Sequence, residues 1–77
     1  MMSDPKNLDY YVNLPYTIEL TPAGDGSWFA KIPLLPGCMT VGDTQQEALE
    51  MIEDAKLGWL SVALEEGDII PEPQPVN

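Results

Sequence analysis

The sequence contains few of the residues from which catalytic and metal-binding sites are usually built. Its 77 residues include a single cysteine, Cys38, and no histidine or arginine. A lone thiol cannot close a disulfide within one chain, and without a second cysteine or a histidine it cannot complete the usual zinc sites. The composition therefore excludes a disulfide framework and a zinc centre of the cysteine and histidine type.

Positive charge is also scarce. Thirteen acidic residues are balanced only by Lys6, Lys31 and Lys56, which leaves a net charge of −10. Such a surface repels phosphate backbones, so nucleic acid is a poor partner. A basic protein is a better one, because a negative surface speeds its encounter with a positive face. The alternative is that the acidity only keeps the domain in solution, since charge alone specifies no partner.

Long apolar runs are missing as well. No segment reaches the length needed to cross a bilayer, and residues 1–6 lack the cationic start and apolar stretch of a signal peptide. We therefore expect a cytoplasmic protein without membrane contact. A chain this short has room for one domain with a thin core, and self-association is the expected source of further stability.

Three short strands are predicted before the middle of the chain. Polar and apolar residues alternate over 16–21 and again over 27–32, and the Pro-Ala-Gly-Asp-Gly run between them is typical of a turn. After a Pro-containing connection, residues 38–41 form a third short strand. A last short strand is expected at Ile69 and Ile70.

The clearest prediction is a long helix. Thr44 and Glu47 form a capping box, no proline follows before Glu66, and Gly67 suits the position after a helix end. Helical periodicity places one apolar stripe against the sheet. Its members are Ala48, Met51, Ile52, Ala55, Trp59, Val62 and Ala63.

These elements predict an α+β fold with the order β-β-β-α-β. A three-stranded antiparallel sheet carries one packed helix, and a short final strand follows. Residues 14–72 form the domain, residues 1–13 are expected to be a flexible N-terminal tail, and residues 73–77 a proline-rich C-terminal tail.

The possible chemistry of the chain is limited. Cys38 has no histidine partner, which favours a structural thiol over a nucleophile. A cluster of carboxylates that holds a divalent ion, as in a nuclease, is the remaining catalytic alternative. Its candidates are Glu19, Asp25, Asp43 and Glu47, which turn formation, helix capping and a solvent-facing strand position explain more simply. We expect no catalytic residue, no metal and no cofactor.

Two segments resemble the HicB family of antitoxins: Gly26 to Cys38, with its Trp-Phe-Ala-Lys-Ile-Pro run, and Gly42 to Ala48. The resemblance extends from Tyr16 to Pro73. It implies a partial RNase H-like fold and an antitoxin that blocks a small basic HicA-type ribonuclease by covering its RNA-binding surface. Members often carry a DNA-binding domain after this module. Because this sequence ends at Asn77, we expect no DNA binding by this chain.

Two surfaces are expected to serve this function. Acidic positions and one aromatic residue are predicted to bind the toxin: Glu19, Asp25, Phe29, Glu50, Glu53 and Asp54. Three leucines on a flank of the polar side of the helix, Leu57, Leu60 and Leu64, are predicted to form a homodimer or higher oligomer. Trp28 and Trp59 are interpreted as core residues, with partner anchors as the alternative. An interaction module without a toxin partner is the main competing function.

Overall fold

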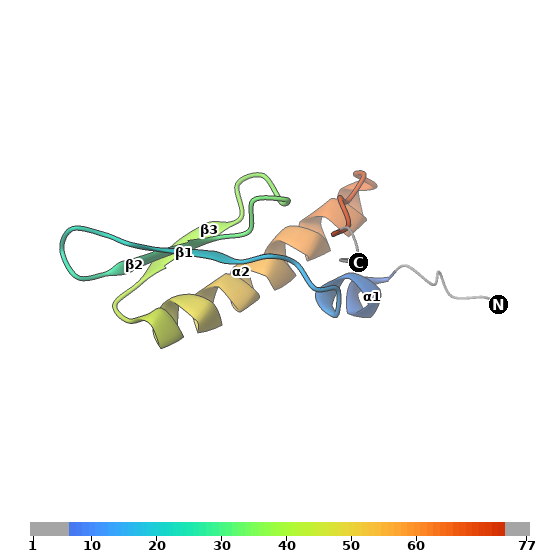
Figure 1. Ribbon diagram of the computed structural model, residues 1–77. Coiled ribbons are helices and arrows are strands. Elements are labelled where there is room, and N and C mark those ends of the chain that lie inside the picture. The colour runs from blue at the N-terminus through green and yellow to red at the C-terminus, as the bar shows by residue number, and fades with distance from the viewer. Residues whose placement is uncertain (1–6, 74–77) are drawn as a thin grey trace.

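The computed structural model describes residues 7–73, in which a short helix precedes three strands and a long helix. The elements are α1 (Leu8–Val12), β1 (Glu19–Pro22), β2 (Trp28–Lys31), β3 (Met39–Gly42) and α2 (Gln45–Glu66). The strands form one antiparallel sheet in the order β1-β2-β3, and α2 lies across one of its faces (Figure 1). The predicted α+β fold, with a three-stranded antiparallel sheet and a packed helix, is confirmed.

The strand register confirms the predicted two-residue alternation. Leu20 pairs with Ala30, which pairs in turn with Thr40, and this row faces α2 with Ala30 completely buried. The next row, Thr21 with Phe29 and Val41, therefore lies on the opposite face of the sheet. We call that opposite side the outer sheet face.

Both ends of α2 have the predicted caps. The Thr44 hydroxyl accepts a hydrogen bond from the Glu47 N–H at 3.0 Å, and the Glu47 carboxylate accepts one from the Asp43 N–H at 2.6 Å. At the other end Gly67 adopts a φ of 72°, a left-handed conformation that costs glycine little. The helix boundaries follow from these local bonds.

The side of α2 that faces the core differs from the predicted one. Ala48, Ile52 and Ala63 are buried as predicted, but Met51 and Val62 are exposed. Lys56 and Leu60 are buried in their place. The helix is thus turned about its axis toward α1, because α1 covers a flank that the sequence pattern left to solvent.

Helix α1 corrects the prediction of a flexible tail over 1–13. Asn7 caps this helix by accepting a hydrogen bond from the Tyr10 N–H at 3.1 Å, and Tyr11 is buried. Lys56 on α2 donates to the Val12 carbonyl at 3.2 Å and forms an ion pair with Glu53 at 2.9 Å. A buried ammonium needs such partners, so Lys56 fastens the end of α1 to α2. Residues 1–6 lie outside the described part.

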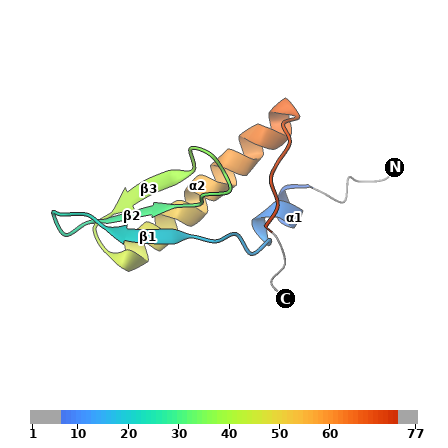
Figure 2. The same ribbon diagram turned by 45° about the horizontal axis from the view of Figure 1, so that its top comes forward.

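The segment after α2 contains no strand over 68–73, which corrects the predicted final strand. It returns along α1 instead (Figure 2). The Tyr16 hydroxyl donates to the Pro71 carbonyl at 2.7 Å, and the Tyr10 hydroxyl donates to Glu72 at 2.9 Å. Burial, and next the Glu72 carboxylate, raise the pKa of Tyr16 to about 12. Side-chain hydrogen bonds, and not a β-ladder, hold this segment in place. Residues 74–77 of the predicted C-terminal tail lie outside the described part.

Gly42 sets the distance between the end of β3 and the start of α2. A Cβ atom on this residue would lie 2.5 Å from the backbone nitrogen of Ala48, which is a severe overlap. Only a glycine therefore permits this close packing, and the neighbouring Ala48 is completely buried. Among the residues that the structure describes, no helix combines the length and apolarity that crossing a membrane requires.

Candidate protein-binding surfaces

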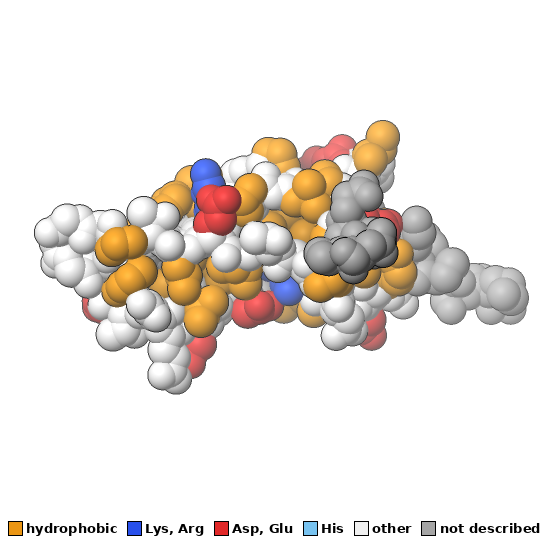
Figure 3. Space-filling model, viewed as in Figure 1, with side chains coloured by type: hydrophobic (Ala, Val, Ile, Leu, Met, Phe, Trp, Pro, Cys, Tyr) orange, Lys and Arg blue, Asp and Glu red, His pale blue; other side chains and the backbone are white. Residues whose placement is uncertain are grey.

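The side of α2 that points away from the sheet is acidic. Its exposed carboxylates are Glu47, Glu50, Asp54 and Glu65, which we call the acidic face. Lys56, the only cation on this helix, is buried on the α1 flank and does not offset them. On the side of the molecule that Figure 3 shows, acidic side chains are scattered over the surface and outnumber the basic ones. This face is suited to a basic partner.

The outer sheet face is mixed in character. Lys31 and Glu19 are 3.9 Å apart on neighbouring strands, and both side chains are exposed to solvent. Beside them Met39 and Val41 are exposed, and Phe29 is half-buried. Because the Lys31 ammonium compensates Glu19, this face has less net charge than the acidic face.

The six residues predicted to bind the toxin do not form one surface. Glu19 and Phe29 lie on the outer sheet face, whereas Glu50 and Asp54 lie beyond the helix that covers the opposite side of the sheet. Asp25 lies in the β1–β2 turn, where it accepts bonds from the Ser27 hydroxyl at 2.6 Å and the Ser27 N–H at 3.1 Å. These bonds lower the pKa of Asp25.

Glu53, the sixth of these residues, pairs with Lys56 on the α1 flank. Its carboxylate therefore pairs with the lysine that donates to the Val12 carbonyl of α1. Of the six residues, only Glu50 and Asp54 belong to the acidic face.

The three leucines predicted to form an oligomer interface also separate. Leu60 is 0% exposed and belongs to the core, so its prediction as a surface residue is wrong. Leu64 is partly buried against the same core, and only Leu57 is exposed. The physical reason is again α1, which packs on this flank of α2.

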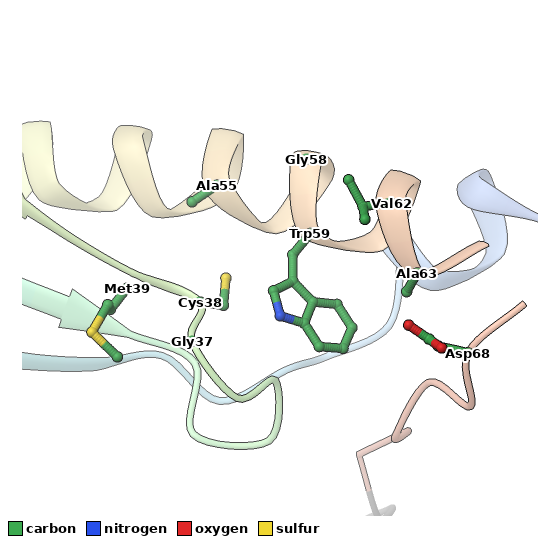
Figure 4. A pocket seen from close by; sticks show the side chains of 9 residues that line it. All are labelled: Gly37, Cys38, Met39, Ala55, Gly58, Trp59, Val62, Ala63 and Asp68. Carbon is green, nitrogen blue, oxygen red and sulfur yellow. The ribbon is translucent and has the colours of Figure 1, made fainter. Parts of the chain in front are cut away.

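An apolar groove lies on the other flank of α2, between that helix and the strand β3. It has a volume of about 570 Å³. In Figure 4 the Trp59 ring extends from α2 toward the loop of Gly37, between Cys38 and Asp68. We call this site the β3–α2 groove. Its lining comprises Gly37, Cys38, Met39, Ala55, Gly58, Trp59, Val62, Ala63 and Asp68.

Trp59 and Cys38 form parts of the groove wall that also belong to the fold. The Trp59 indole N–H donates to the Pro36 carbonyl at 2.8 Å, and its ring packs on the core. Trp28 packs on the core as well. Cys38 is buried, and this burial raises the pKa of its thiol, as a structural cysteine requires. Sequence reasoning missed the groove, although a glycine inside a long helix, Gly58, was a usable signal.

Three of the four carboxylates of the nuclease alternative are engaged separately. Glu19 pairs with Lys31, Asp25 serves the hairpin turn, and Glu47 caps α2 at Asp43. Within residues 7–73, no three Asp, Glu, Cys or His side chains are grouped so that they would hold a metal ion. The geometry does not gather the cluster that this alternative requires.

Fold and surfaces together define a class: a small two-layer α+β domain with an acidic helix face and an open apolar groove. Comparison with known proteins specifies the family. Residues 15–77 match the model of the HicB_like antitoxin of bacterial toxin-antitoxin systems. The chain therefore belongs to the HicB-like antitoxin family.

Individual relatives agree with this assignment. The chain is 39% identical over 65 residues to Antitoxin HicB 1 of Photorhabdus laumondii and 36% identical over 62 residues to Antitoxin HicB of Escherichia coli. These matches cover 84% and 80% of this chain but 42% and 45% of the relatives, so the chain spans less than half of their length. The names describe antitoxins and not enzymes, which is consistent with the predicted absence of catalysis.

A second group of relatives is closer to this chain in length. UPF0150 protein Ta0767 of Thermoplasma acidophilum is 34% identical over 58 residues, a match that covers 75% of this chain and 84% of the relative. Its name states no function. Sequences similar to this chain thus occur both within longer proteins named antitoxins and in a chain of about this size.

Proposed function

We propose that this chain is an antitoxin module that binds and neutralises a small basic ribonuclease toxin of the HicA type. The observation that carries the proposal is the acidic face of α2 on a chain of the HicB-like antitoxin family. An exposed row of carboxylates attracts a cationic RNA-binding surface and competes with RNA for it. Because the toxin's substrate is cellular RNA, the complex forms in the cytoplasm.

An inhibition assay tests this proposal. A purified HicA-type ribonuclease is mixed with increasing amounts of the chain, and cleavage of a labelled RNA is followed. We expect cleavage to fall as a complex forms, and the complex to weaken about tenfold or more between about 50 mM and about 500 mM salt. Full ribonuclease activity at a large excess of the chain would contradict the proposal.

A charge variant provides the matched control for the assay. Glu50→Gln with Asp54→Asn removes two exposed carboxylates and keeps the shape of both side chains. We expect weaker inhibition at low salt and a smaller loss of affinity as salt is added. Direct DNA binding by this chain remains excluded in the proposal, because the same carboxylates repel a duplex.

Self-association is part of the proposal and rests on the small size of the chain. Leu57 is the one exposed member of the leucine trio, since Leu60 is in the core. Light scattering over a dilution series measures the mass directly. A monomeric mass at every concentration would remove this part of the proposal and leave toxin binding intact.

The relatives of similar length favour a second candidate function, an interaction module whose partner is not a toxin. The genes beside the one that encodes this chain distinguish the two candidates. A neighbouring frame that encodes a small basic ribonuclease supports the antitoxin, and its absence supports the second candidate.

A further inference from the structure

The β3–α2 groove exposes apolar side chains that the fold does not use. Val62, which lines this hollow, is 52% exposed. Met39 borders the hollow at the start of β3, but its side chain lies on the outer sheet face in the row of Lys31 and Glu19. Met51, also exposed, extends this flank by one helical turn, because it precedes Ala55 by four residues. A contiguous apolar area of this kind on a small domain is typical of an interaction site.

Gly58 deepens the groove without serving the packing of this chain. Glycine is disfavoured inside a helix, and Gly58 lies near the middle of α2. A Cβ atom there would have no neighbour within 4 Å, in contrast to Gly42, where it would strike the backbone of Ala48. The fold therefore needs the glycine at position 42 but not at position 58. The missing side chain leaves room for a group from outside the chain.

The border of the groove is acidic and lacks a cation. Asp54 precedes Gly58 by one helical turn and Glu65 follows it by two, so both lie along its row. Asp68 lines the groove itself. Lys31 lies on the outer sheet face, and Lys56 is buried on the α1 flank. Within residues 7–73, no lysine is thus left to neutralise this border.

The negative charge at the border of the groove determines which kind of partner can bind there. A second copy would bring a second set of the same carboxylates against this border and would be repelled, whereas a cationic protein segment is attracted. We propose that the β3–α2 groove receives one or more apolar side chains of the basic toxin, and that Lys or Arg residues beside them face Asp54, Glu65 and Asp68. This inference rests on the proposed function. The groove supplies the apolar contact and its border supplies charge pairing.

A pair of glycine variants tests the assignment. Gly58→Leu fills the groove from an unstrained helical position, and Gly24→Leu adds the same side chain in open space at the distant β1–β2 turn. The affinity of each variant for a purified HicA-type ribonuclease is measured by calorimetry. We expect Gly58→Leu to lose at least about tenfold in affinity and Gly24→Leu to stay within about twofold of the unchanged chain.

Folding is checked by circular dichroism and thermal melting for every variant. Val62→Ser provides a second test that does not add volume, because this side chain lines the groove and is 52% exposed. We expect this variant to keep its melting temperature to within a few degrees and to lose about fivefold or more in affinity. A loss of affinity that follows only a loss of structure would overturn the assignment.

The outcomes separate this inference from the proposed function. If the unchanged chain does not bind the ribonuclease, both fail. If it binds and inhibits, but the groove variants bind as tightly as Gly24→Leu, only the groove assignment is overturned. If the groove variants instead dissociate a dimer of the chain, and that dimer tightens as salt is added, a second copy occupies the groove and the assignment is wrong.

Discussion

The two flanks of α2 differ in what covers them. On one flank α1 packs against Leu60 and Leu64, and Lys56 bonds to the last residue of α1. On the other flank the helix borders the β3–α2 groove, where Gly58 and Val62 are exposed. The covered flank contributes to stability, and the open flank is available for binding. Substitutions on the two flanks should therefore change different measurements.

The largest expected effect comes from Leu60→Ala on the covered flank. This change removes a completely buried side chain, and such a cavity costs about 2 to 5 kcal/mol of unfolding free energy. Val62→Ala on the open flank is the matched control and should cost about 1 kcal/mol or less, because its side chain is already half in water. Urea unfolding measures both. Equal losses of unfolding free energy in Leu60→Ala and Val62→Ala would contradict the distinction between the two flanks.

The pH dependence of stability tests the segment that closes over α1. The pKa of Tyr16 is raised to about 12 in the folded state, above its ordinary value of 10.0. The stability that its neutral hydroxyl contributes is complete below pH 10 and is lost as the pH rises toward 12, by about 2 to 3 kcal/mol. Tyr16→Phe should remove this part of the loss in alkaline melting curves. If Tyr16→Phe loses as much stability at alkaline pH as the unchanged chain does, groups other than Tyr16 cause the loss.

Lys56→Met tests the bond that holds α1. The change keeps an apolar stem of similar length but leaves the Val12 carbonyl without its ammonium donor. The expected cost is about 1 to 3 kcal/mol, with faster amide hydrogen exchange in α1. Exchange rates in α1 that match those of the unchanged chain would show that apolar packing alone holds this helix.

The smallest expected effect is a gain in the free energy of unfolding. Gly58→Ala adds a Cβ atom where nothing lies within 4 Å and removes a glycine from a helix interior, which should raise the unfolding free energy by about 0.5 to 1 kcal/mol. Gly42→Ala, the control, should destabilise the chain because its Cβ would overlap Ala48. A loss of stability in Gly58→Ala would mean that the glycine serves the fold.

Local signals predicted most of the fold. The alternation around Leu20 and Ala30 and the cap at Thr44 each act over a few residues, and the structure has the strands and helix that they indicate. The orientation of α2 was not predictable in this way. Whether Leu60 or Val62 faces the core depends on α1, whose packing relies on a bond between Lys56 and Val12, 44 positions apart in sequence.

The sequence indicated acidic positions but not which of them share a surface. Acidic charge identified Glu50 and Asp54, which lie on one face of α2. Pattern reasoning grouped them with Glu19 and Phe29, which the sheet separates from them. The groove escaped prediction because its lining residues, such as Cys38 and Gly58, are far apart in the sequence and border one hollow only when β3 lies beside α2.

The most direct test of the account is a methyl NMR titration of the chain with unlabelled HicA-type ribonuclease. Methyl groups report on side chains of both flanks in one experiment. We expect the resonances of Ala55 and Val62 in the groove to shift or broaden, while those of Leu8 and Leu64 on the covered flank stay in place. Shifts confined to the covered flank or to Val41 on the outer sheet face would contradict the claim that the open flank of α2 binds the partner.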